Sequence, residues 1–303
     1  MFAEKSIEKF AASKSEDKTA VKMKSGVGGC EVFKISYRGQ QAVIKTGADE
    51  LGRSEIANNV VSYAEMQKLR IGDIVAPKIF AQGESEGISY LILEYLGTDF
   101  RNRATSQNTV PMTNVMIKQL KSAYEITLNK DTFSSKKWLE DRKQDIARYF
   151  ELYLIPTGFA NKNDLAKLQS LEMAKIAPEK FTWATRDLTP DNIFVNGERL
   201  TIIDAKAGAN GIPIVDLAMF ATLTGEVYLL PNGNEAAMLA RNFARRVSEQ
   251  MLQTQFGDEL FKFGEIFQYA LSVRFRKDKD SRSPAFVQSI RDRMEEISVA
   301  MRK

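Results

Sequence analysis

Residues 185–208, TRDLTPDNIFVNGERLTIIDAKAG, place a short β-rich pattern inside an otherwise helical part of the chain. Asp187 is followed five positions later by Asn192 and then by an apolar run. The turn Asn196-Gly197 leads into a second apolar run, which ends in Asp204. Two strand-like runs joined by a tight turn predict a hairpin. We therefore expect Asp187, Asn192 and Asp204 to lie together at one end of that hairpin.

Three convergent oxygen-bearing side chains suit in-line phosphoryl transfer. That reaction needs one carboxylate to orient the attacking hydroxyl and take its proton. It also needs an amide and a second carboxylate to hold Mg²⁺ against the phosphates. The hairpin offers these three groups in the required types.

The composition excludes several other chemistries. The 303 residues include no histidine and one cysteine, Cys30. This rules out a Ser-His-Asp triad, a His- or Cys-ligated zinc and an internal disulfide. Acid–base work would fall to carboxylates or lysines, and any metal would be a hard cation with oxygen ligands. We read Cys30 as a buried or loop-lining residue without a catalytic role.

Charge and hydropathy indicate a globular protein without a nucleic-acid or membrane partner. The formal net charge is only +4 and is spread along the chain. The first 18 residues lack the apolar core of a signal peptide. The longest apolar stretches, such as residues 88–96, are too short to span a bilayer. We expect a cytoplasmic protein; its oligomeric state is left open.

Two regions of different character predict an α+β fold with two lobes. Helix-like spacing covers residues 2–14 and 49–70, and short strands with turns at Arg38-Gly39-Gln40 and 84–87 make up the rest of the first part. Further helices are expected at residues 112–128, 136–154, 162–176, 214–225, 233–252, 257–273 and 284–302. We therefore expect an antiparallel-sheet N-lobe with one helix (1–96), a helical C-lobe (97–303) and a ligand cleft between them.

The hairpin and the following IVDLAMF (residues 214–220) resemble the aminoglycoside phosphotransferase and choline kinase family, and more distantly protein kinases. The resemblance implies a bilobal protein-kinase-like fold, ATP and Mg²⁺ as cofactors, and transfer of the γ-phosphate to a hydroxyl of a small-molecule acceptor. It implies that Asp187 orients and deprotonates the acceptor, and that Asn192 and Asp204 bind Mg²⁺. Asp216 would start or brace a helix and support the catalytic loop.

The N-lobe motifs extend the resemblance toward the nucleotide. SGVGG, with Gly26, Gly28 and Gly29, resembles a phosphate-binding glycine loop, and Lys45 in AVIK matches the strand lysine that contacts the α- and β-phosphates. That lysine needs a carboxylate on the next helix, and Glu55 and Glu65 are both candidates. LEYLG resembles the hinge, where backbone groups of Glu94 to Leu96 would meet adenine and Leu93 would back the pocket.

Departures from the family keep two alternatives open. Thr185 stands where the family usually has histidine. Arg186 matches an arginine that protein kinases often have at this position, and this match favours an atypical protein kinase. However, only the eleven residues 205–215 separate Asp204 from Asp216, which leaves no room for an activation segment. The unusual Asp-Ala-Lys, in which Lys206 could contact phosphate or an anionic substrate, keeps a pseudokinase binding module as the other alternative. An aminoglycoside, amino alcohol, sugar or related metabolite would fit the acceptor role.

Overall fold

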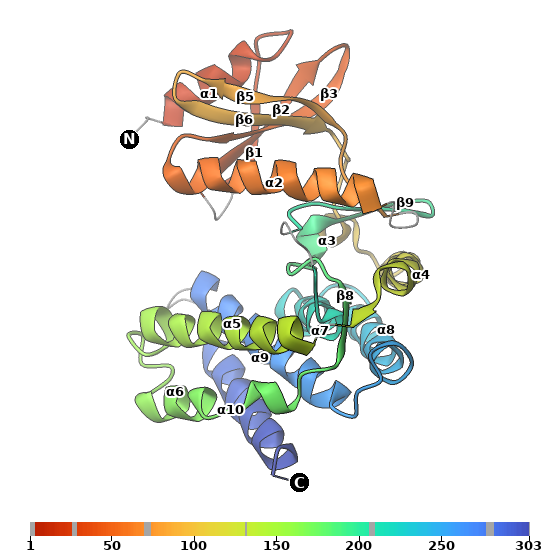
Figure 1. Ribbon diagram of the computed structural model, residues 1–303. Coiled ribbons are helices and arrows are strands. Elements are labelled where there is room, and N and C mark those ends of the chain that lie inside the picture. Colours follow the sequence, from red (N-terminus) through yellow and green to blue (C-terminus); the bar gives the residue numbers. More distant parts are fainter. Residues whose placement is uncertain are drawn as a thin grey trace.

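The computed structural model describes residues 4–25, 29–69, 74–130, 132–205, 210–276 and 282–302. These residues form a sheet-rich N-lobe and a mostly helical C-lobe, which confirms the two-lobe prediction (Figure 1). The last helix of the chain ends at the side of the C-lobe that faces away from the N-lobe.

The N-lobe is an antiparallel sheet in the order β1-β2-β3-β6-β5. Its strands are β1 (Val21–Ser25), β2 (Cys30–Tyr37), β3 (Gln40–Gly47), β5 (Ile79–Ser85) and β6 (Ile88–Glu94). The turn between β2 and β3 places Arg38 and Gly39 at φ 53° and 72°. Consecutive positive φ angles match the twist of a tight hairpin, so this predicted turn is confirmed.

A helix covers each face of this sheet. Helix α1 (Glu4–Ser13) packs Phe10 and Ala11 into a small core with residues such as Phe33 and Ile44. Helix α2 (Glu50–Leu69) covers the other face, and its residues Ile56, Tyr63 and Met66 belong to the main core, which continues into the C-lobe. The site at the lobe boundary therefore rests on one continuous apolar core.

The predicted catalytic hairpin forms a second sheet. A short 3₁₀ turn (Pro190–Asn192) leads into β9 (Ile193–Asn196), which pairs with β10 (Arg199–Ile202). Strand β4 (Ile74–Val75) pairs with β10 in parallel and adds the third strand. Strand β4 therefore belongs to this sheet, and the N-lobe hairpin consists of β5 and β6.

The C-lobe contains the expected helices with shifted boundaries, together with the short helix α3, which was not predicted. They are α3 (Phe100–Arg103), α4 (Thr109–Thr127), α5 (Thr132–Tyr149), α6 (Lys162–Gln169), α7 (Pro213–Thr222), α8 (Gly233–Arg246), α9 (Gly257–Arg276) and α10 (Ser283–Ala300). Helices α5, α7 and α8 each continue into a π-helical turn, at Phe150–Leu154, Leu223–Val227 and Val247–Leu252. No helix within the described ranges is long and apolar enough to cross a membrane.

Two features of the C-lobe differ from expectation. Helix α6 begins at a capping box on Asn161 but ends at Gln169, seven residues before the predicted end at 176. Ser170 Oγ donates to the carbonyl of Lys167, and such local side-chain bonds compete with helix continuation. A small sheet of β7 (Asn129–Lys130), β8 (Lys180–Trp183) and β11 (Asn210–Gly211) was also not predicted.

Candidate active site

The hairpin brings Asp187, Asn192 and Asp204 together. Ile193 pairs with Ile202 across the two strands, and the N–H of Ile203 donates to the carbonyl of Asn192 at 3.0 Å. This contact sets Asp204, the next residue, beside Asn192. The Asn192 amide in turn donates to Asp187 Oδ2 at 3.0 Å and to the Asp187 carbonyl at 3.2 Å. The side chains of Asp187 and Asn192 are therefore in contact, and the backbone of the hairpin brings Asp204 next to Asn192.

Asp216, in the first turn of α7, binds the loop that contains Thr185 and Arg186. Its Oδ2 accepts from Thr185 Oγ1 at 2.9 Å and from the Arg186 N–H at 3.0 Å. The N–H of Asp187 donates to the same Thr185 hydroxyl at 3.1 Å. Arg186 has φ 61°, an uncommon left-handed conformation for a residue other than glycine, so this support holds a strained backbone.

Burial sets the protonation of Asp216. Complete burial raises the pKa of this carboxyl to about 6, although the bonds from Thr185 and Arg186 act in the opposite direction. The Asp216 Oδ1 atom is buried and has no hydrogen-bond partner among the described residues. Asp216 is thus a buried structural acid close to the site, and it does not need to contact a substrate.

Lys45 joins the N-lobe to the hairpin. Its ammonium lies 2.5 Å from Glu55 Oε1, 2.9 Å from Asn59 Oδ1 and 2.9 Å from Asp204 Oδ1. Burial alone would lower the pKa of Lys45, but the carboxylates of Asp204 and Glu55 outweigh it and raise the pKa above its usual value. Lys45 therefore stays charged although it is buried.

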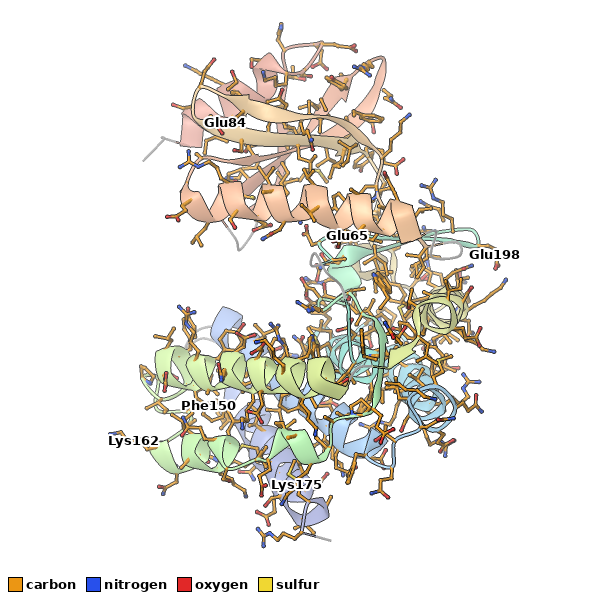
Figure 2. The ribbon with its side chains drawn as sticks, viewed as in Figure 1. Glu65, Glu84, Phe150, Lys162, Lys175 and Glu198 are labelled. Carbon is orange, nitrogen blue, oxygen red and sulfur yellow. The ribbon has the colours of Figure 1, made fainter. Side chains whose placement is uncertain are left out.

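The structure distinguishes between the two candidate partners of Lys45. Glu55 makes the ion pair, whereas Glu65 lies ten residues further along α2, which corresponds to about 15 Å of helix. Figure 2 shows Glu65 in the half of α2 that lies over the C-lobe hairpin. The proposed pairing with Glu65 is therefore wrong. Glu55 fits because α2 begins early, at Glu50, and Gly47 and Gly52 let its first turn approach β3 closely.

The glycine loop is described only at Gly29. Gly29 has φ 81°, and a Cβ atom there would lie 2.8 Å from Asp49 Oδ1, so this position requires glycine. Asp49 accepts from the Gly52 N–H at 2.7 Å and so caps the start of α2. Gly26 and Gly28, and likewise Lys206 after the hairpin, lie outside the described residues.

The predicted hinge follows β6. Leu93 is buried, and the Glu94 N–H donates to the Lys78 carbonyl at 2.9 Å. The Glu94 carboxylate accepts from the Lys78 N–H at 3.0 Å and lies 3.4 Å from Arg199 of β10. The N–H and the carboxylate of Glu94 thus already have partners in Lys78 and Arg199.

Sequence reasoning missed three polar contacts beside the site. The Asp204 N–H donates to the hydroxyl of buried Tyr63 at 3.3 Å. Asp191 accepts from Tyr228 at 2.6 Å and from Arg101 at 3.1 Å. These partners come from α2, from α3 and from the residue that follows the π-helical turn after α7, and no local pattern marks them. Burial raises the pKa of Tyr63, so its hydroxyl stays protonated.

The donor set fits a divalent hard cation that phosphate also binds. Asn192 and Asp204 offer one amide oxygen and one carboxylate, and Mg²⁺ commonly takes few protein ligands besides phosphate and water. Within the described ranges, no three His, Cys, Asp or Glu side chains gather into an all-protein metal site. The chain thus suits a metal that arrives with a phosphorylated ligand.

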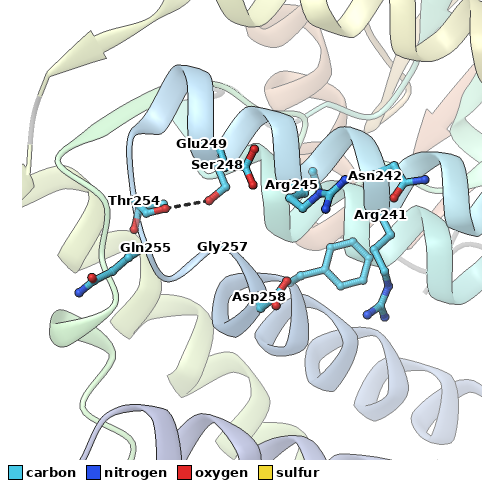
Figure 3. A pocket seen from close by; sticks show the side chains of 11 residues that line it. Arg241, Asn242, Arg245, Ser248, Glu249, Thr254, Gln255, Gly257 and Asp258 are labelled. Carbon is cyan, nitrogen blue, oxygen red and sulfur yellow. Dashed lines mark hydrogen bonds between the residues drawn. The ribbon is translucent and has the colours of Figure 1, made fainter. Parts of the chain in front are cut away.

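A separate hollow lies between α8 and α9, on the C-lobe away from the hairpin. It has a volume of about 510 Å³, and its walls include Arg241, Glu249 and Asp258 (Figure 3). Ser248 Oγ donates to the Thr254 carbonyl at its edge. None of the predicted site residues lines it, and it contains both signs of charge, so we do not assign the chemistry to it.

Comparisons with known proteins match the whole architecture. No protein-family model and no curated protein matches the chain. Among solved structures, a putative fructosamine-3-kinase from Haemophilus somnus is 14% identical, with 95% of this chain and 96% of that chain covered and a TM-score of 0.59. The aminoglycoside phosphotransferase APH(4)-Ia, as a thermostable mutant in ternary complex with ADP and hygromycin B, is 12% identical, with 98% of each chain covered and a TM-score of 0.61.

A choline kinase from Cryptosporidium parvum is 13% identical, with 99% of this chain and 95% of that chain covered and a TM-score of 0.55. Similarity at this low identity establishes the fold. The chain therefore has the bilobal protein-kinase-like fold that these small-molecule kinases share, as the sequence predicted.

Proposed function

We propose that this protein is an ATP- and Mg²⁺-dependent phosphotransferase that moves the γ-phosphate of ATP onto a hydroxyl of a small molecule. The observation that supports this most is the junction at which Lys45 contacts Asp204 while Asn192 contacts Asp187. These two contacts support an arrangement in which Lys45 would bind phosphate, Asn192 and Asp204 would bind the metal, and Asp187 would remain a separate carboxylate.

Each residue then has a distinct task. Asp187 orients the acceptor hydroxyl and accepts its proton as the bond to phosphorus forms. Lys45, held by Glu55, binds the α- and β-phosphates of ATP, and Gly26, Gly28 and Gly29 cover them. Bound Mg²⁺, held by Asn192 and Asp204, would neutralise charge on the phosphates. The backbone of Glu94 and Leu96 would bind adenine.

The neighbours and the short segment after Asp204 support a small-molecule acceptor. All three compared structures are described as kinases or phosphotransferases of small molecules, and APH(4)-Ia is described with ADP and hygromycin B. The eleven residues between Asp204 and Asp216 leave little room for an activation segment of the protein-kinase type. We therefore propose an aminoglycoside, amino alcohol, sugar or related metabolite as acceptor, in a cytoplasmic enzyme.

The testing experiment measures ADP formation with Mg²⁺ and ATP across a panel of aminoglycosides, amino alcohols, sugars and nucleosides. Thermal stabilisation by ATP with Mg²⁺ is measured on the same protein. Turnover with one acceptor is the expected result. Stabilisation without turnover on any acceptor would favour the pseudokinase. The absence of both stabilisation and turnover would contradict the proposed nucleotide site.

A further inference from the structure

One stripe of α2 faces the site with three side chains. Glu55, Asn59 and Tyr63 follow each other at intervals of four residues, and residues four apart lie one above another on a helix. Glu55 and Asn59 contact the ammonium of Lys45, and Tyr63 contacts the backbone of Asp204. A single rigid element thus reaches both the lysine and the last residue of the hairpin.

Lys45 has no spare proton in this arrangement. An ammonium group has three N–H donors, and those of Lys45 lie within hydrogen-bond distance of Glu55, Asn59 and Asp204. A phosphate that binds Lys45 must therefore replace one of these partners. Asp204 is the partner outside α2, so it is the one that can be exchanged while the helix keeps its hold on the lysine.

If phosphate replaces Asp204 at the Lys45 ammonium, another interaction must keep Asp204 in position. It has φ 55°, a left-handed conformation that asparagine and aspartate tolerate better than most residues but that still needs support. The described bond from its N–H goes to the Tyr63 hydroxyl. The Tyr63 ring is 1% exposed and packed in the main core, so the position of this hydroxyl is fixed by packing.

We propose that Tyr63 is a positioning residue for the metal site, in that its hydroxyl holds the backbone of Asp204 so that the carboxylate can bind the metal. This inference rests on the proposed function. It assigns to α2 a role in the metal-binding half of the site, beyond the ion pair between Glu55 and Lys45. The interaction is formed by the backbone of Asp204, so only the tyrosine hydroxyl can be removed by mutation.

The test compares Tyr63→Phe with Tyr269→Phe. Both tyrosines are 1% exposed and both hydroxyls are hydrogen-bonded, but Tyr269 donates to Glu226 in the C-lobe. Phenylalanine keeps the ring and its packing, so both variants should fold. Turnover is titrated with Mg²⁺ at saturating ATP, and thermal stabilisation by ATP is measured with and without Mg²⁺.

Tyr63→Phe should need about ten-fold more Mg²⁺ for half-maximal turnover, the usual size of one lost hydrogen bond to a buried group. Its additional thermal stabilisation by Mg²⁺ should shrink, while stabilisation by ATP alone should be unchanged. Tyr269→Phe should match the wild type in both readouts. An unchanged Mg²⁺ requirement in Tyr63→Phe, or an equal shift in both variants, would overturn the inference. A wild-type protein without any nucleotide response would overturn the proposed function, and this inference with it.

Discussion

Two carboxylates flank the catalytic loop in opposite surroundings. The side chain of Asp204 is 30% exposed and faces the charged ammonium of Lys45, whereas Asp216 is 1% exposed and faces mainly the hydroxyl and N–H groups of the loop. In the Lys45 network the ammonium is buried, whereas the carboxylates of Glu55 and Asp204 are partly exposed, so a ligand could replace a partner there. The Asp216 network is buried and fixes backbone shape. In the proposed site, the Lys45 network would thus bind the ligand, whereas the Asp216 network fixes the backbone of the loop.

The largest expected effect is on the binding network. Lys45→Met removes the cation between Glu55 and Asp204, leaving the two carboxylates without their shared partner and the phosphates without a charged donor. We expect kcat/KM to fall by roughly 10²–10³-fold, the range seen when one preorganised donor is removed from an active site. Steady-state ADP formation measures this.

The matched control is Lys118→Met. Lys118 also pairs with a glutamate, Glu198, at 2.6 Å, but both side chains are 69% exposed. Exposed pairs of this kind contribute little. Lys118→Met should therefore behave like the wild type, and a Lys45→Met enzyme within three-fold of the wild type would contradict the assignment of Lys45.

The Asp216 network should make the stability of the protein depend on pH. Asp216 has a folded pKa of about 6, above the usual 3.8, so the folded protein holds this proton more tightly than the unfolded chain. Its contribution to the free energy of unfolding is thus greatest below pH 4 and is lost as the pH rises through about 6. A shift of this size corresponds to about 3 kcal/mol at most.

Asp216→Asn removes this titration. Urea unfolding of both proteins between pH 4.5 and 7.5 should show the wild type losing stability relative to the variant as the pH rises. Parallel stability profiles would show that Asp216 does not titrate in this window, and the comparison between a charged binding network and a buried acid would then fail.

A smaller effect separates the two glutamates of α2. Glu55→Gln keeps the shape of the side chain but removes the charge that holds Lys45, so kcat/KM should fall about ten-fold, as expected for one charge-assisted bond at a partly exposed site. Glu65→Gln makes the same change about 15 Å further along the helix and should leave kcat/KM within two-fold. The same ADP assay compares them, and an equal loss in both would contradict the pairing.

The sequence predicts local features of this molecule well. The hairpin from β9 to β10 follows from an apolar–turn–apolar pattern only a few residues long, and its register sets Asn192 beside Asp204. Helix α2 was likewise predicted to within one residue at each end. In both cases the interactions that determine the structure are close in sequence.

Contacts between distant segments could not be predicted in this way. The bond between Asp204 and Tyr63 joins residues 141 positions apart, and β4 pairs with a strand more than a hundred residues later. The choice of Glu55 over Glu65 depends on how closely the start of α2 approaches β3. That distance is set by Gly47 and Gly52, where a Cβ on Gly47 would meet the Gly52 carbonyl carbon at 2.3 Å.

The most direct test of the account follows the γ-phosphate itself. ATP labelled at the γ-position is incubated with Mg²⁺, the acceptor panel and either the wild type or Asp187→Ala. The account predicts label in a small-molecule product with the wild type. It predicts a loss of about 10²–10⁴-fold in Asp187→Ala, the usual contribution of a general base, with thermal stabilisation by ATP and Mg²⁺ retained. Undiminished transfer by Asp187→Ala, or label that enters added protein in place of the small molecules, would contradict it.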